Sequence, residues 1–87
     1  MGVLRSSDLW EDETYTQTAT DPEPLDLVLF NQTKDAYGAH VGIYLDSRKI
    51  LHLCRKIGTP LIWEMEDFLK LEEYRVLIGF KRPIKKD

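Results

Sequence analysis

The middle of the chain is predicted to form a β-hairpin, from the stretch of residues 40–54 that reads HVGIYLDSRKILHLC. Apolar residues alternate with other residues on either side of the turn-forming segment 46–49, a pattern typical of paired antiparallel strands. We expect strands over residues 40–45 and 50–55. The hairpin carries both histidines of the chain, His40 and His52. Histidine is the side chain most easily poised as a base near neutral pH, so the pair raises the question of catalysis.

The register of this hairpin is predicted from its aliphatic residues. Val41, Ile43 and Leu45 point to one side, so the partner strand should place its leucines there as well. The predicted pairs are Leu45 with Leu51, Ile43 with Leu53, Tyr44 with His52, and Gly42 with Cys54. The second face of the hairpin is then shared by His40, Gly42, Tyr44, His52 and Cys54.

The remaining pattern predicts an α+β fold, a curved antiparallel sheet of about five strands with one short helix between the fourth and the fifth. The further strands are expected over residues 26–30, 61–63 and 74–80, and the helix over 64–71. Residues 1–24 are expected to form an N-terminal arm and linker, with one helical turn around Leu9 and Trp10. Residues 25–87 are expected to form the sheet subdomain.

Composition limits the partners and the compartment. A length of 87 residues fits one small domain, and a net charge of −3 gives no reason to expect nucleic acid as a partner. The single cysteine, Cys54, excludes an internal disulfide. No apolar run is long enough for a membrane span or a signal peptide, so the expectation is a cytoplasmic protein as written, or one of the cell envelope if the natural start lies upstream. No cofactor is predicted.

The residues alone leave three interpretations of the histidine face open. In the first, His40 is a general base that His52 orients, and a cysteine or serine is the nucleophile. Cys54 is a poor candidate for that role, because it lies within a strand rather than at a helix N-terminus that would lower its pKa. In the second, His40, His52 and Cys54 bind a metal ion, although the paired short spacings of zinc sites are absent. In the third, both histidines are structural.

Several stretches resemble the C-terminal half of the NlpC-type cysteine peptidases, papain-like bacterial enzymes that cut peptidoglycan stem peptides. The stretches are DLVLF at 26–30, HVGIYL at 40–45, ILHL at 50–53, YRVLIGFKR at 74–82 and GVLRSS at 2–7. The last resembles the segment that follows the catalytic helix of the family, without its usual proline before the arginine. The glycine that is common in the family before the aspartate of the first strand is replaced here by Leu25.

The resemblance implies a papain-like half-domain in which His40 is the catalytic base and His52 the polar residue that orients it. The nucleophilic cysteine of the family lies at the N-terminus of a helix that precedes the matched stretch, and Cys54 does not match its position. We therefore expect the base-bearing half of a cysteine peptidase, inactive as an isolated chain. The alternatives are a non-catalytic binding module derived from the family and one half of a two-chain enzyme.

The resemblance also suggests a partner. The catalytic helix of the family covers the polar face of the hairpin, so a groove is expected here beside His40, Gly42 and Tyr44. We expect a helical partner chain, a second copy of this chain, or the N-terminal arm with Leu9 and Trp10 to occupy it.

Overall fold

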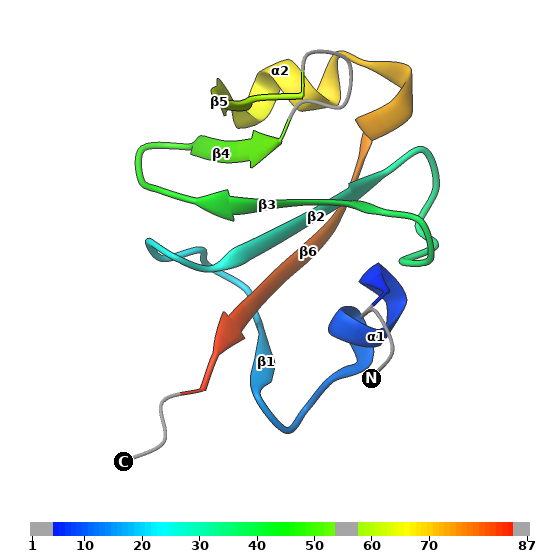
Figure 1. Cartoon of the computed structure of the whole chain (residues 1–87), viewed down its shortest axis with the longest axis vertical. Helices are drawn as coiled ribbons and strands as arrows, with labels where there is room; N and C mark the ends of the chain where they lie inside the picture. Colours follow the sequence, from blue (N-terminus) through cyan, green and yellow to red (C-terminus); the bar gives the residue numbers. More distant parts are fainter. Residues whose placement is uncertain (1–4, 54–57, 85–87) are drawn as a thin grey trace.

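The computed structural model describes residues 5–53 and 58–84, which form one antiparallel sheet with two short helices (Figure 1). The elements are α1 Ser6–Glu11, β1 Thr16–Ala19, β2 Leu27–Asn31, β3 His40–Tyr44, β4 Lys49–Leu53, β5 Pro60–Glu64, α2 Met65–Leu69, the 3-10 turn η1 Glu72–Tyr74, and β6 Val76–Pro83. The strand order is β1-β6-β2-β3-β4-β5. The predicted α+β class is confirmed.

The sheet has six strands, against about five expected from the sequence. The additional strand is β1, which comes from the segment predicted as arm and linker and pairs with β6, Thr16 opposite Pro83 and Ala19 opposite Phe80. The residues at 17 and 18 are polar, so a search for alternating apolar residues does not find this strand. An edge strand with a solvated face needs few apolar side chains. The helical turn predicted around Leu9 and Trp10 is present as α1.

The predicted register of the central hairpin is wrong by two residues. Ile43 pairs with Leu51 and Tyr44 with Ile50, instead of with Leu53 and His52. The cause is a tighter turn: the Lys49 amide donates to the Asp46 carbonyl at 2.8 Å. The two residues between them, Ser47 and Arg48, have φ values of 48° and 63°. Two consecutive left-handed residues make the turn type whose twist suits a two-stranded hairpin.

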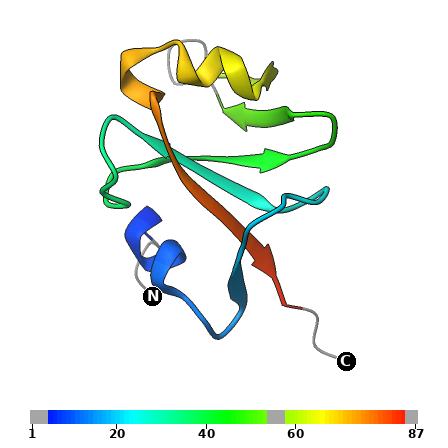
Figure 2. The ribbon, with the colours of Figure 1, turned by 180° about the vertical axis from the view of Figure 1, so that it is seen from behind.

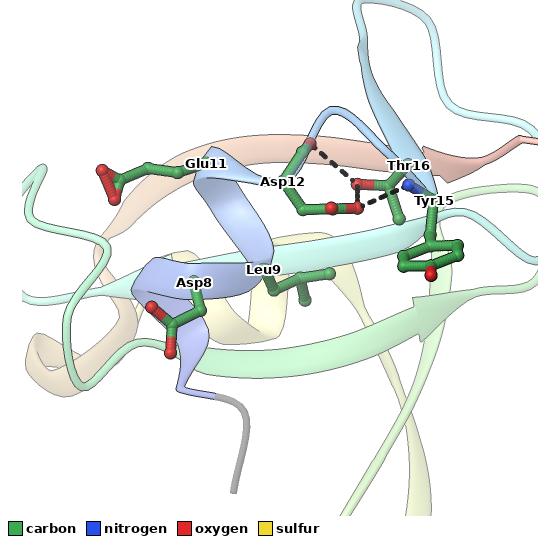
Figure 3. Close-up of a pocket in the computed structure, with 6 residues that line it drawn as sticks. All are labelled: Asp8, Leu9, Glu11, Asp12, Tyr15 and Thr16. Atoms are coloured by element: carbon green, nitrogen blue, oxygen red, sulfur yellow. Dashed lines mark hydrogen bonds between the residues drawn. The ribbon is translucent and has the colours of Figure 1, made fainter. Parts of the chain in front are cut away.

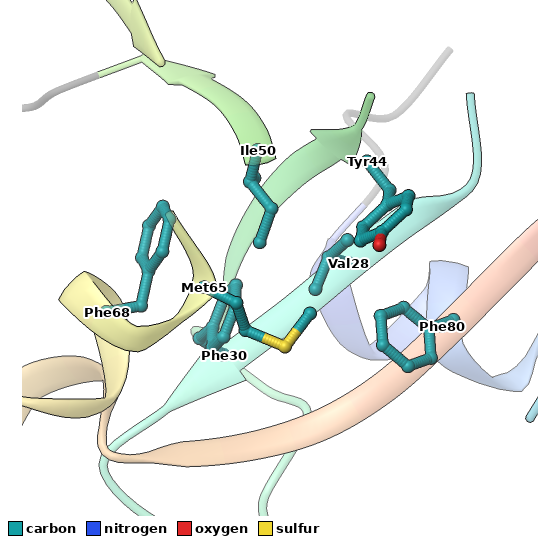
Figure 4. Packing of buried hydrophobic residues seen from close by; sticks show 7 residues of the cluster. All are labelled: Val28, Phe30, Tyr44, Ile50, Met65, Phe68 and Phe80. Carbon is teal, nitrogen blue, oxygen red and sulfur yellow. The ribbon is translucent and has the colours of Figure 1, made fainter. Parts of the chain in front are cut away.

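A shift by two residues preserves the faces of the strands, because side chains alternate with a period of two. The described part of the histidine face, His40, Gly42, Tyr44 and His52, therefore stays together. This face is the buried one, with exposed fractions of 7% for His40 and 8% for Tyr44. The helix α2 covers the face on which a groove was predicted, because its Met65 and Phe68 join the core that Tyr44 helps to form (Figure 4).

The opposite face of the sheet carries α1 at one end. Trp10 lies so close to Gly79 in β6 that a Cβ atom there would be 2.6 Å from the indole ring. Gly79 alternates with the core residue Phe80 and pairs with Leu29, so this contact is on the side away from the core. The N-terminal arm therefore packs on the face opposite the histidines, and α1 and α2 lie at different ends of the sheet (Figure 2).

Near β5, the face of the sheet opposite the histidines is exposed to solvent. Leu51 pairs with Ile62 there, and Ile62 has an exposed fraction of 58% and Leu53 of 56%. Pro60 is the first residue of β5, an edge strand, where its missing N–H group removes no hydrogen bond from the centre of the sheet. In the part of the chain that the structure describes, neither helix has the length and apolar character needed to cross a membrane.

Candidate active site

The position of His40 is set by the turn that precedes β3. The hydroxyl of Ser6 in α1 donates to the Ala36 carbonyl at 2.5 Å and accepts from the Ala39 amide at 2.9 Å. Gly38 adopts a φ of 76° in this turn, a conformation that glycine reaches without steric cost. The Ser6 hydroxyl thus connects α1 to the residue immediately before His40.

The structure brings together the two histidines that the sequence singles out. Nε2 of His40 lies 3.0 Å from Nδ1 of His52, within hydrogen-bond distance. The two rings stand nearly perpendicular, at 84°. His52 has an exposed fraction of only 3%, so this contact is shielded from water.

Gly42 lies between the two histidines on the same face and leaves room for the neighbouring strand. A Cβ atom at this position would lie 2.6 Å from Cγ2 of Ile50 and 3.1 Å from the carbonyl oxygen of Leu51, both closer than ordinary contacts. Glycine therefore lets β3 and β4 approach at the level where His52 reaches His40. Alternation along the strand placed Gly42 on this face but indicated no role for it.

Aromatic side chains enclose the pair, and sequence reasoning did not associate them with it. Trp63 and Phe68 meet the ring of His52 edge to face, with centroid distances of 4.3 Å and 4.6 Å. Tyr74 stacks on His40 at 4.8 Å. Trp63 could have been found from its alternation in β5. Tyr74 was predicted to begin the last strand, but it lies in the 3-10 turn, and that strand begins at Val76.

Burial lowers the pKa of His52 below its ordinary value of 6.5, because the surrounding protein disfavours the charged imidazolium. His52 is therefore a neutral imidazole at neutral pH, with one ring nitrogen protonated and the other able to accept. A neutral ring at hydrogen-bond distance from a second histidine is suited to orient that histidine.

The two ring nitrogens of His40 have different surroundings. Nε2 is directed to His52, so Nδ1 is the nitrogen through which His40 would exchange a proton with a nucleophile or a leaving group. In the triads of acyl-transfer enzymes, a hydrogen bond of this kind joins the base to the residue that orients it.

The third member of the metal interpretation, Cys54, lies outside the described residues, as does its predicted pairing with Gly42. Within residues 5–53 and 58–84, no group of three histidine, cysteine or acidic side chains could hold a metal ion.

A separate hollow of about 400 Å³ lies beside α1, and neither histidine lines it (Figure 3). It is lined by Asp8, Leu9, Glu11, Asp12, Tyr15 and Thr16. Burial raises the pKa of Asp12, but hydrogen bonds from the backbone and hydroxyl groups of residues 14–16 outweigh this and hold it below its usual value. The Asp12 carboxylate thus stabilises the turn from α1 to β1.

Comparisons with known proteins identify no relative: no family model, no curated protein and no solved structure matches this chain.

Proposed function

We propose that the chain supplies the general base and its orienting residue for a cysteine-type hydrolysis of peptide amides, with peptidoglycan stem peptides as the substrate class. The observation that carries the proposal is the buried contact of 3.0 Å between Nε2 of His40 and Nδ1 of His52. The substrate class rests on the resemblance to the NlpC-type peptidases.

The backbone at Leu25 gives the resemblance separate support. Leu25 has a φ of 79°, in the left-handed region that favours glycine. The NlpC-type peptidases commonly have glycine at the matching position. The backbone before Asp26 thus adopts a conformation that explains the glycine of the family, even though the residue here is leucine.

In the proposed reaction, Nδ1 of His40 takes the proton of a cysteine thiol, and the thiolate attacks the carbonyl carbon of the amide. The carbon–nitrogen bond then breaks while His40 returns the proton to the leaving amine, and water hydrolyses the thioester. His52 holds the His40 ring in place throughout. The nucleophile would come from a segment outside these 87 residues or from a second chain, and the 87-residue chain alone is expected to be inactive.

The test is a chimera that joins the cysteine-bearing helix of an NlpC-type peptidase in front of residue 1. Its substrate is a peptidoglycan stem peptide with a fluorophore and a quencher on either side of the scissile amide. Hydrolysis is expected, and His40→Ala should lower kcat at least about 100-fold, the range of general-base catalysis. His52→Asn should retain more activity than His52→Ala, because the amide oxygen of asparagine accepts a hydrogen bond.

The matched controls are Lys34→Ala, an exposed residue in a loop, and the chimera without its helix cysteine. The first should keep full activity and the second should lose it. A folded chimera that hydrolyses nothing, or whose activity survives His40→Ala, would contradict the proposal.

A second candidate is a non-catalytic interaction module, which the burial of the histidines favours. The surface available to a partner is then the face of β4 and β5 opposite the histidines, where Leu53 and Ile62 are exposed. It adjoins the free edge of the sheet, since β5 is an edge strand. A second copy packed face to face would cover this surface on both chains. Sedimentation would then show a dimer that Ile62→Lys dissociates, whereas a monomer at every concentration would reject this candidate.

A further inference from the structure

One buried side-chain nitrogen of the described residues lacks a hydrogen-bond partner, and it belongs to the histidine pair. It is Nε2 of His52, on the ring whose Nδ1 faces His40. A buried nitrogen without a partner has a free-energy cost, and such atoms are rare enough in folded proteins to require an explanation.

The protons of the pair have two arrangements when both rings are neutral. In the first, His52 carries its proton on Nε2, so its Nδ1 accepts a hydrogen bond from Nε2–H of His40. In the second, His52 carries its proton on Nδ1 and donates it to Nε2 of His40. The first arrangement leaves an N–H group at the buried position, and the second leaves a bare lone pair there.

Two aromatic rings lie against the ring of His52. Trp63 and Phe68 lie against it at interplanar angles of 63° and 68°, which brings edges and faces of the rings into contact. The face of an aromatic ring is electron-rich, so it attracts an N–H group and repels a lone pair. A ring face presented to Nε2 of His52 would therefore satisfy a proton there in part, whereas it would repel a lone pair.

We propose that Trp63 and Phe68 present ring faces to Nε2 of His52 and are thereby positioning residues that fix the tautomer of the pair, with His52 protonated at Nε2 and His40 protonated at Nε2. The basic nitrogen of His40 is then Nδ1, the atom that faces away from His52. The catalytic meaning of this assignment rests on the proposed function, whereas the tautomer itself is a property of the chain alone.

The consequence for the base is that its active tautomer is set before any substrate arrives. If His52 instead donated from Nδ1, the single proton of neutral His40 would be on Nδ1, and the ring would have no lone pair with which to accept a thiol proton there. The aromatic residues would thus act through His52 on His40 without touching a substrate.

The experiment is long-range ¹H–¹⁵N correlation NMR on the ¹⁵N-labelled chain at a pH above 7, where the lowered pKa keeps His52 neutral. Both histidines are expected to show the pattern of a proton on Nε2. A His52 ring protonated on Nδ1 would overturn the proposal, and this result on the unmodified chain is decisive whether or not any variant folds.

Two substitutions at Trp63 test the aromatic cause. Trp63→Phe keeps a ring face and should keep the tautomer, whereas Trp63→Leu should lower the ratio of Nε2–H to Nδ1–H in His52 by about two- to fivefold, the size of one N–H contact with a ring. An unchanged ratio in a folded Trp63→Leu chain would remove Trp63 from the proposal. Peptidase activity is not part of this readout, so an inactive chimera with the expected tautomer would reject only the proposed function.

Discussion

Nε2 of His40 and Nδ1 of His52 lie 3.0 Å apart, although twelve residues separate the two histidines in the chain. The contact joins neighbouring strands and is shielded by α2, β5 and the 3-10 turn, whose aromatic side chains pack around it. It therefore depends on the whole central part of the sheet, and changes in the protonation or the framework of the pair should be measurable as changes in stability.

The first prediction is that stability falls as the medium becomes acidic. The pKa of His52 is lower in the folded chain than the value of about 6.5 in the unfolded chain. Between the two values the unfolded state binds more protons, so the free energy of unfolding rises with pH. The contribution is complete above about pH 6.5 and is lost as the pH falls below it. Urea unfolding between about pH 5 and pH 7.5 measures it, and His52→Gln should flatten the slope. An equal slope in both chains would show that another group is responsible.

The second prediction concerns the left-handed residue Leu25, whose side chain is largely exposed. Leu25→Gly removes the strain of a positive φ, about 1–2 kcal/mol, but increases the entropy of the unfolded chain by about 0.5–1 kcal/mol. A net gain of about 0.5–1 kcal/mol in the free energy of unfolding is expected.

The matched control for Leu25 is Gly38→Ala. Gly38 has a φ of 76°, and a Cβ atom at this position would have no other atom within 4 Å, so only the backbone penalty applies there. That variant should lose about 1 kcal/mol. Two variants that change stability in the same direction would contradict the assignment of strain to Leu25.

The third prediction is an energetic coupling between Trp10 and Gly79. Gly79→Ala introduces a methyl group 2.6 Å from the indole ring, at a φ of 153° that side chains rarely adopt. It should cost about 1–3 kcal/mol, partly because α1 must shift from the sheet. In a Trp10→Ala chain the methyl group has space, so the cost should fall by at least about 0.5 kcal/mol. Chemical denaturation of the four chains of this double-mutant cycle measures the coupling. Additive effects would mean that the indole ring does not limit this position.

The fourth prediction is that Ser6 supports the turn that leads into His40. Ser6→Ala removes the hydroxyl that bridges Ala36 and Ala39, and should cost about 1 kcal/mol of stability. NMR of the variant should show shifted ring signals for His40, with smaller changes at Trp63. Ser7→Ala is the control, since its hydroxyl does not form this bridge. Ring signals of His40 that are the same in both variants would separate Ser6 from the site.

Much of the framework of the site was predictable from alternation. The segments around Leu29, Ile43, Leu51 and Val76 read as strands because apolar residues recur there between turn signals, and each of them lies in a strand. Pro60 restricts its strand to an edge of the sheet or to a start at that residue, and β5 meets both conditions. The strand β1 was not predicted. Its stability comes from pairing with β6, more than sixty residues later in the chain, rather than from its own composition.

The predicted register of the hairpin was wrong for a specific reason. Leu45 and Leu53 were both assumed to need aliphatic partners on one face, whereas the structure leaves Leu53 mostly exposed and buries the opposite face. The pairing is set by the left-handed residues Ser47 and Arg48, which neither glycine nor asparagine marks in the sequence. Hydrophobicity alone could not show which face α2 would cover.

The sequence by itself determined that His40 and His52 lie on neighbouring strands and share one face, because side chains in strands alternate with a fixed period. Only the tertiary structure decided that their ring nitrogens are 3.0 Å apart, that they are buried, and that Trp63, Phe68 and Tyr74 surround them. These properties depend on the turn geometry and on packing between distant segments, which a local pattern of residues does not encode.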